Sequence, residues 1–450
     1  MARVNRRAVR WLRGELPDLV ASGTVTPEAA DAIRRHYDSR ESSQANFGFV
    51  LLAIVGSVLI GAGVILLIAH NWDELSRPLR STIALAPLIG AEVLGVFVLL
   101  RRDESPSWRE SVAICIVATL GTAISLISQT YQIQGSFADF MCLWMLLSLP
   151  IVYLFRTTVG AVAYVIGTVT WLFAKAGWRF NDPAELCFWL LLLAIVPYYI
   201  LLLRRDRASA APTFLSILLV AATAIGLGCT AELTRANLGG VAYAGLFTSI
   251  YLCGMRFFPR GEGQRLHPLS LVGGLGIGVT AIVLSFEWMW HLPIASMWSM
   301  HGAPQAIGIA VELFFPAVAV ALLAWICGKR QKTAFSIAAA IMPLVAGLAL
   351  LIANLAPPET RGDDSAYSMA AAIIFNVYAL ALGIELIARG VRANSVARAN
   401  FGLLIIAALA MCRFFDSDLG FVTRGLGFII VGVGFLVANV IFFKKRKGAA

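Results

Sequence analysis

The sequence contains few charged residues. Only 14% of its 450 residues are Asp, Glu, Lys or Arg, whereas 59% are hydrophobic. An ordinary soluble domain carries about 25% charged residues, so this composition excludes a soluble fold. The formal net charge of +10 is what a membrane protein acquires when it retains Lys and Arg in its cytoplasmic loops. Because no basic motif accompanies that charge, we predict no nucleic-acid partner.

Several motifs with known chemistry are also missing. None of the seven cysteines forms a CxxC pair, and all lie within or at the ends of apolar runs, which favours buried thiols over disulfides or zinc ligands. No GxSxG, Walker or HExxH motif is present. We therefore predict no metal and no cofactor, while a membrane-embedded enzyme that uses Asp or Glu stays open. The first 46 residues are mostly polar, and we expect no cleavable signal peptide.

Apolar runs of about 20 residues, the length of a transmembrane helix, are abundant. We predict an all-α polytopic bundle of about fourteen spans, within a range of about 12 to 15. A hairpin at residues 1–46 precedes the bundle at 47–443, and a basic tail at 444–450 follows it. The predicted spans are residues 47–69, 79–100, 110–129, 138–155, 158–174, 184–203, 211–230, 238–258, 268–290, 306–327, 333–354, 367–388, 398–414 and 421–443.

The distribution of basic residues indicates the orientation of these spans. Lys and Arg are retained on the cytoplasmic side, whereas acids contribute little. With fourteen spans and a cytoplasmic start, only eight of the 36 Lys and Arg are external, which leaves 28 inside. We therefore predict a bacterial inner-membrane protein with both termini in the cytoplasm. The eight external residues are Arg77, Arg80, Lys175, Arg179, Arg235, Arg361, Arg413 and Arg424.

The N-terminal segment predicts a small helical hairpin. Its two helices, residues 5–21 and 27–37, are separated at Ser22-Gly23. Thr26 can cap the second helix, with Pro27 at its first position, where proline loses no hydrogen bond. We favour a hairpin that docks beneath the membrane part over a lipid sensor.

Three glutamates, Glu92, Glu312 and Glu385, lie inside apolar runs. An ionised carboxylate at mid-bilayer costs at least about 2.5 kcal/mol, so we expect each to face the bundle interior with a partner or water, or to be protonated. Glu385 precedes Arg389 by one turn, which favours a structural ion pair. Glu312 lies about 9 Å into its span and could reach the external interface. Glu92 is the strongest candidate for a proton-linked or cation-contacting group.

The third span adds a polar stripe. Thr119, Thr122, Ser125 and Gln129 recur every three or four residues and share one helix face. This face lines a cavity or a helix contact, unless its hydroxyls bond their own helix backbone. The glutamines around Tyr131 suggest a polar external mouth. The candidate pathway or substrate contacts are therefore Glu92, Thr122, Ser125, Gln129, Tyr131 and Glu312.

Two external connections place carboxylates and arginines next to aromatic residues. One includes His70 and Asp73, and the other includes Arg413 and Asp416. The pattern fits an aromatic belt with interfacial ion pairs. It also fits an external site for an anionic or zwitterionic head group, which arginine would hold with two parallel hydrogen bonds.

A resemblance to a known family rests on three parts of the sequence: Ser22-Gly23 with Thr26-Pro27, the stretch from Ala69 to Leu75 and on to Arg80, and Ser128-Gln129-Thr130-Tyr131-Gln132. On these residues the N-terminal third resembles a bacterial family of predicted membrane proteins defined by domain of unknown function 2157. The resemblance covers roughly residues 10–155 and implies a polytopic inner-membrane protein, without an established activity or catalytic residue.

Many helices, a carboxylate in mid-span and little soluble mass favour a transporter or a lipid-linked flippase-like protein. Its expected partners are membrane lipids and a lipid-like or small-molecule substrate. One alternative is a membrane-embedded enzyme acting on a lipid or lipid-linked sugar, with Asp73, Glu74 or Asp416 as acid or base. The other is a non-catalytic assembly or sensor protein whose hairpin binds a cytoplasmic partner.

Overall fold

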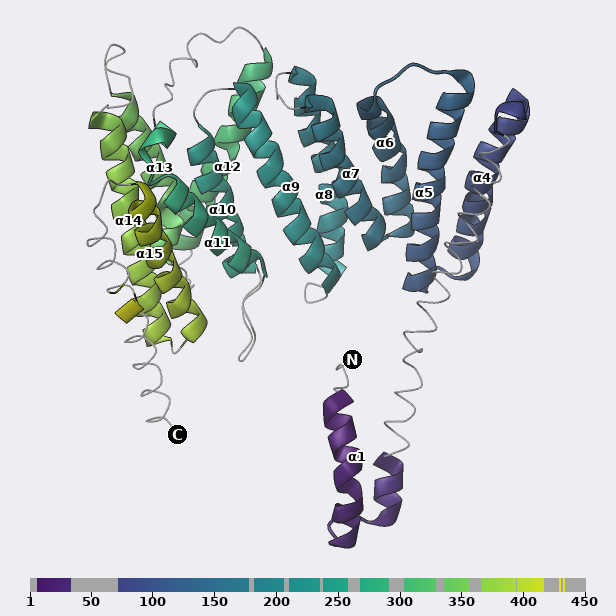
Figure 1. Cartoon of the computed structure of the whole chain (residues 1–450), viewed down its shortest axis with the longest axis horizontal. Coiled ribbons are helices and arrows are strands. Elements are labelled where there is room, and N and C mark those ends of the chain that lie inside the picture. Colours follow the sequence, from purple (N-terminus) through teal and green to yellow (C-terminus); the bar gives the residue numbers. More distant parts are fainter. Residues whose placement is uncertain are drawn as a thin grey trace. The chain divides into compact units, whose positions relative to one another are not determined.

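A computed structural model describes most of the chain between residues 6 and 416. The residues described are 6–33, 72–177, 182–205, 210–234, 238–257, 268–290, 303–328, 336–355, 366–393 and 395–416, together with 429, 432 and 433. Every regular element among them is helical, which confirms the predicted all-α class (Figure 1). The chain divides into two compact units, residues 1–82 and 83–450.

The first unit contains the predicted hairpin. Helix α1 spans Arg6–Ala21 and ends at a turn in which Gly23 has a φ of 74°, a left-handed conformation that glycine adopts without a steric penalty. The hydroxyl of Thr26 accepts the backbone N–H of Ala29 at 3.3 Å, so threonine caps the second helix as predicted. That helix is described as far as residue 33. Leu16 of α1 is 1% exposed, and Ala30 of the second helix is 4% exposed.

The bundle helices overlap twelve of the predicted spans, although the helix in the predicted span 268–290 ends at Val283, seven residues early. Ten helices of the described ranges are long and apolar enough to cross a membrane, whereas α10 and α11 complete the twelve as apolar helices of 19 and 16 residues. The predicted spans 47–69 and 421–443 lie outside the described residues, apart from three isolated positions. The helices are α4 (Arg77–Arg101), α5 (Pro106–Tyr131), α6 (Phe137–Phe155), α7 (Thr158–Ala176), α8 (Cys187–Arg205), α9 (Ala210–Thr234), α10 (Gly239–Phe257), α11 (Pro268–Val283), α12 (Ala303–Gly328), α13 (Ile337–Asn354), α14 (Ala366–Arg392) and α15 (Val396–Asp416).

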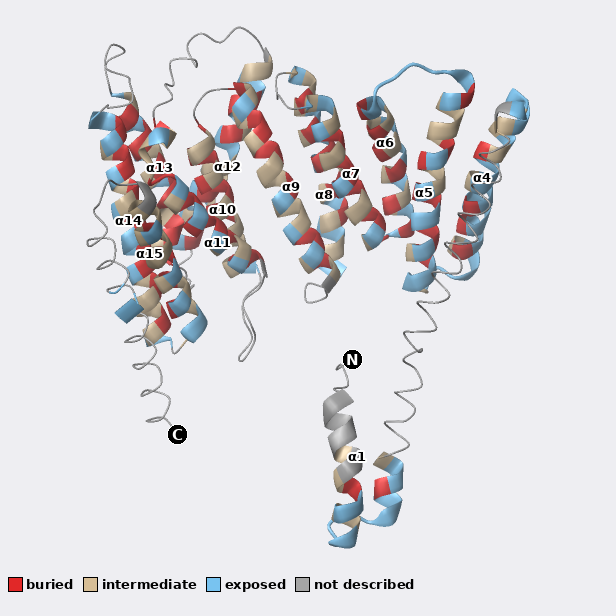
Figure 2. Cartoon of the chain, viewed as in Figure 1, coloured by how far each residue is buried: buried red, intermediate tan, exposed pale blue. Residues whose placement is uncertain are grey.

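Three short 3-10 helices join or precede these elements: η1 (Trp72–Glu74), η2 (Pro183–Leu186) and η3 (Glu287–Trp290). In the bundle, α5, α6 and α7 pack on one another, and α7 also packs on α9. Helix α10 packs on α11, α12 and α13, while α14 packs on α13 and α15. Buried residues gather on the sides where neighbouring helices meet (Figure 2).

Small residues determine how closely some helices approach. A side chain at Gly245 of α10 would overlap the backbone of Pro316 in α12, and one at Gly383 of α14 would overlap α15. Such contacts let dispersion hold helices together where burial from water cannot. The four-residue spacing of Gly274 and Gly278 predicts that both pack against a neighbouring helix. Gly274 faces open space instead, with no heavy atom within 4 Å of an added Cβ.

Candidate functional site

Glu312 is a fully buried carboxylate on α12, with 1% of its surface exposed. Helix α12 begins at Ala303, three residues before the predicted span, so Glu312 lies about 13 Å along the helix rather than 9 Å. The low exposure places this carboxyl group inside the bundle, against Thr234, the last residue of α9. It is therefore the strongest described candidate for a functional intramembrane acid.

The hydrogen bonds of Glu312 are incomplete. Its Oε1 is in close contact with the hydroxyl of Thr234 on α9, and its Oε2 has no hydrogen-bond partner among the described residues. The Thr234 hydroxyl also lies 3.3 Å from the carbonyl oxygen of Ala231. A threonine hydroxyl has a single proton to donate. A protonated Glu312 that donates to Thr234, which then donates to Ala231, satisfies both contacts.

The surroundings of Glu312 are largely apolar. Trp189 donates from Nε1 to the Thr230 hydroxyl at 3.0 Å, and its ring lies 6.0 Å from that of Phe315. Gly308, one turn before Glu312, allows α12 to approach the threonine methyls of α9. No described residue forms an ion pair with Glu312, and burying an unpaired charge is expensive. The arrangement therefore favours the neutral acid.

A cavity of about 760 Å³ lies between the ends of α9, α10 and α11. Glu232 and Tyr243 are among its few polar lining groups, and Gly228 and Gly240 also line it, next to Tyr243 and Leu284 respectively. Ala231 lines the same cavity, and its carbonyl oxygen accepts the hydroxyl proton of Thr234. A chain of three residues thus connects the cavity wall to the buried carboxyl of Glu312.

Arg413 connects α15 to the end of α11. Its Nη2 donates to the carbonyl oxygen and the hydroxyl of Ser285, at 3.0 and 3.1 Å. The guanidinium carbon lies 4.6 Å from the ring centre of Phe286, and Asn376 of α14 donates to the same carbonyl at 3.1 Å. These contacts join three helices, as expected for a structural arginine.

The other predicted external residues are only partly described. His70 lies outside the described residues, as do the side chains of Asp73 and Asp416, although Asp73 belongs to η1 and Asp416 ends α15. The shared external site that would include Arg413 therefore stays a prediction.

Glu92 lies on α4, where its side chain is exposed. The expected interior position is not what the structure shows, because the buried side of α4 is formed by Ala91, Gly95 and Val98. These small or compact residues pack against α5 and α6, since a side chain at Gly95 would meet Phe155. A role for Glu92 in a pathway stays a prediction.

The polar stripe of α5 is largely bonded to its own helix. The hydroxyls of Thr119 and Thr122 donate to carbonyl oxygens four residues earlier, at 2.8 and 3.0 Å. Ser125 is half-buried, and both Gln129 and Tyr131 are exposed near the end of the helix. The two threonine hydroxyls therefore adopt the backbone-bonded alternative, and the structure does not bring this stripe together with Glu312.

Two further glutamates anchor helix ends. Glu385 forms the predicted ion pair with Arg389, at 2.7 Å, and accepts the Ser336 hydroxyl at 2.6 Å. It also accepts the backbone N–H groups of Ile337 and Ala338, at 3.1 and 3.0 Å, and so holds the start of α13. The spacing of Glu385 and Arg389 predicts their pair, but no sequence signal assigns the partner helix.

Glu110 does the same for α7 and was not among the predicted functional residues. Its carboxylate contacts the Thr157 hydroxyl and accepts the backbone N–H groups of Thr158 and Val159, at 2.7 and 3.0 Å. A carboxylate is a strong acceptor for such unpaired N-terminal groups. The signal available in the sequence is a threonine followed by an apolar run, which marks the helix start but not its distant partner.

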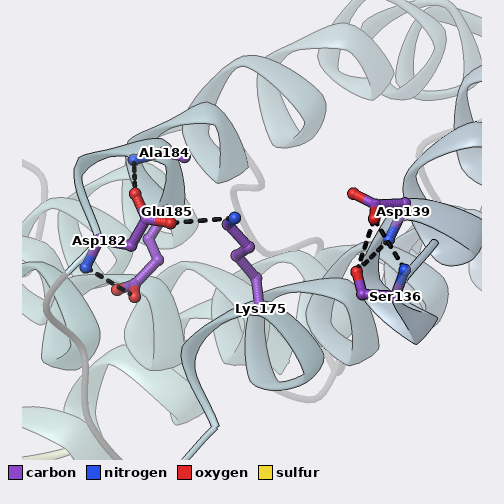
Figure 3. Close-up of polar contacts among 6 residues, drawn as sticks. All are labelled: Ser136, Asp139, Lys175, Asp182, Ala184 and Glu185. Carbon is purple, nitrogen blue, oxygen red and sulfur yellow. Dashed lines mark hydrogen bonds and ion pairs between the residues drawn. The ribbon is translucent and has the colours of Figure 1, made fainter. Parts of the chain in front are cut away.

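Polar residues also cap the start of α6 and the start of η2 (Figure 3). Ser136 and Asp139 form a reciprocal capping box at the start of α6. Asp182 accepts the N–H of Ala184 at 2.9 Å and pairs with Lys175 of α7, also at 2.9 Å. The hydrogen bond from Ala184 and the ammonium of Lys175 lower the pKa of Asp182 from its usual 3.8.

Comparison with known proteins gives one match. No curated protein and no solved structure matches the chain. Residues 17–161 match the model of a family described as predicted membrane protein (DUF2157), the family that the N-terminal third of the sequence resembles.

Proposed function

We propose that this membrane protein moves a lipid-like or small-molecule substrate across the bilayer, with Glu312 as the group that binds and releases a proton. The observation that supports this proposal is the incomplete hydrogen bonding of a buried carboxyl group, with Oε2 unpartnered among the described residues. Ionisable residues inside membrane helices commonly mark substrate or proton pathways.

The contacts suggest how a proton would be linked to the substrate. Neutral Glu312 can donate to Thr234, which can in turn donate to Ala231 at the cavity wall, while Oε2 has no partner among the described residues. Loss of the proton leaves a buried charge that requires a cation, water or new donors. The arrangement of α9 and α12 that brings such groups to Glu312 must differ from the one described. Protonation therefore biases an equilibrium between two arrangements of the helices.

The cavity indicates the kind of substrate. Its lining is mainly apolar, with Glu232, Tyr243 and Thr280 as polar groups. An amphiphile with an apolar body fits this lining better than a highly polar solute, because unpaired polar groups are expensive to transfer there.

Proteoliposomes provide the test. We would measure two probes separately, a fluorescent phosphatidylethanolamine and tetraphenylphosphonium, with and without an imposed pH gradient. Wild-type protein should accelerate movement of at least one probe in a gradient-dependent way, whereas Glu312→Gln should lose the dependence on the gradient. Glu92→Gln is the matched control, because Glu92 is an intramembrane carboxylate with an exposed side chain.

A gradient response that survives in correctly folded Glu312→Gln would contradict the proposed role. Loss of the response in Glu92→Gln alone would instead place the proton-linked group on α4. If the wild-type protein accelerates neither probe, the proposed substrate class is wrong.

A further inference from the structure

A second cavity lies at the other end of the bundle from Glu312 and has a different chemistry. It has a volume of about 310 Å³ and is formed by residues of α10, α11, α13, α14 and α15. It lies where α14 ends and α15 begins, the side that the distribution of basic residues predicts to be cytoplasmic. Its volume is at the small end of the range for ligand pockets.

The cavity is apolar along most of its length. Leu275, Leu382 and Phe401 are among its lining residues. Gly274 contributes no side chain, and a Cβ at this position would have no heavy atom within 4 Å. Leu271 and Leu275 also line the cavity and are 47% and 50% exposed, so the opening is bordered by apolar surface. This surface suits entry of a hydrocarbon chain from the bilayer.

One end of the cavity is basic. Arg389 and Arg398 both line it, and both lie close enough to Tyr251 to act electrostatically on its hydroxyl. Glu385 neutralises Arg389 through their 2.7 Å ion pair. No described carboxylate forms an ion pair with Arg398, so the cavity carries an uncompensated positive charge.

Tyr251 adds a hydrogen-bond donor to this end. Its hydroxyl oxygen accepts the backbone N–H of Ser336 at 3.0 Å, which leaves its own proton for another acceptor. A guanidinium and a tyrosine hydroxyl among the lining groups of an apolar cavity match an anionic head group with a hydrocarbon tail.

We infer that this cavity binds one anionic phospholipid from the adjoining leaflet. The phosphate lies at Arg398 and Tyr251, and one acyl chain occupies the space beside Gly274. The apolar opening favours a lipid over a soluble anion, because a free phosphate would gain nothing from the leucines at the entrance. The site is independent of the proposed transport function, since it shares none of its residues.

Native mass spectrometry of the detergent-purified full chain tests the inference, with phosphatidylglycerol and phosphatidylcholine added as probes. Wild-type protein should retain phosphatidylglycerol in preference to phosphatidylcholine. Arg398→Gln should weaken phosphatidylglycerol binding about tenfold, because a charge-assisted hydrogen bond is lost. Arg392→Gln is the matched control, because Arg392 is exposed on α14 and does not line the cavity.

A second pair of variants tests the acyl-chain part of the site. Gly274→Trp should fill the cavity and prevent lipid retention, whereas Gly347→Trp on α13 should not, although neither glycine has a heavy atom within 4 Å of an added Cβ. Equal binding of both lipids, or unchanged binding in Arg398→Gln and Gly274→Trp, would overturn the inference. Competition by inorganic phosphate as effective as by phosphatidylglycerol would show a soluble-anion site instead.

Discussion

Replacement of Glu385 should release the start of α13. In Glu385→Ala, the N–H groups of Ile337 and Ala338 lose the acceptor that the structure assigns to them, and Arg389 loses its ion-pair partner. Hydrogen bonds to a charged group contribute about 1.5–3 kcal/mol each. Water reaches this place, since the side chains of Glu385 and Arg389 are 23% and 28% exposed, so we expect a total loss of about 3 kcal/mol.

The effect is measurable by hydrogen exchange of the detergent-purified protein. A loss of about 3 kcal/mol should accelerate exchange in the first turn of α13 about 100-fold. Glu385→Gln retains one acceptor oxygen and should show a smaller acceleration, about tenfold. Glu110→Ala is the matched control, because it should accelerate exchange at Thr158 and Val159 and leave α13 unchanged. Unchanged exchange at Ile337 and Ala338 in folded Glu385→Ala would refute the reasoning.

Three further predictions follow from other contacts. The folded-state pKa of Asp182 is lowered, so its stabilising contribution is complete above about pH 3.8 and is lost as the pH falls through the lowered value. The thermal unfolding temperatures of wild type and Asp182→Asn should therefore differ at pH 7 but not in strong acid. Gly245→Ala should lower the free energy of unfolding in SDS by about 1–3 kcal/mol, because its Cβ overlaps the backbone of Pro316. Gly347→Ala should be neutral or stabilising by up to about 1 kcal/mol. Equal effects of the two variants would contradict the close approach of α10 to α12. Removal of residues 1–46 should leave insertion and probe movement intact, and loss of function without loss of insertion would favour the assembly or sensor alternative.

Hydropathy alone predicts the helices well, because the length of a membrane-spanning run is imposed by the bilayer. Hydropathy predicts the first and last residues of each helix less accurately, and this affects where Glu312 lies along its helix. Three additional residues at the start of α12 change the depth of this carboxyl group from about 9 Å to about 13 Å. The burial of Glu312 itself comes from its packing against α9, which the hydropathy of its own helix does not predict.

The side of a helix that packs is harder to predict, because it depends on the partner. Glu92 follows Ala91, and both lie in one apolar run, yet only Ala91 is buried. Local spacing does predict the Glu385 pair with Arg389, because an i,i+4 pair needs no tertiary information. The contacts of Glu110 with Thr157 and of Thr234 with Glu312 join different helices, so their recognition requires the packing itself.

The two carboxylate anchors differ in the order in which the ribosome makes their parts. Glu110 is synthesised 47 residues before Thr157, so its carboxylate already exists when α7 emerges. Glu385 is synthesised 49 residues after Ser336, a delay of about 2.5–10 s at roughly 5–20 residues per second. During that interval the start of α13 has the Ser336 hydroxyl, which accepts the N–H of Ala339 at 3.1 Å, but not the carboxylate that later holds its first turn. The first turn of α13 therefore gains its carboxylate acceptor only after α14 has been made, whereas the acceptor for α7 is present from the start.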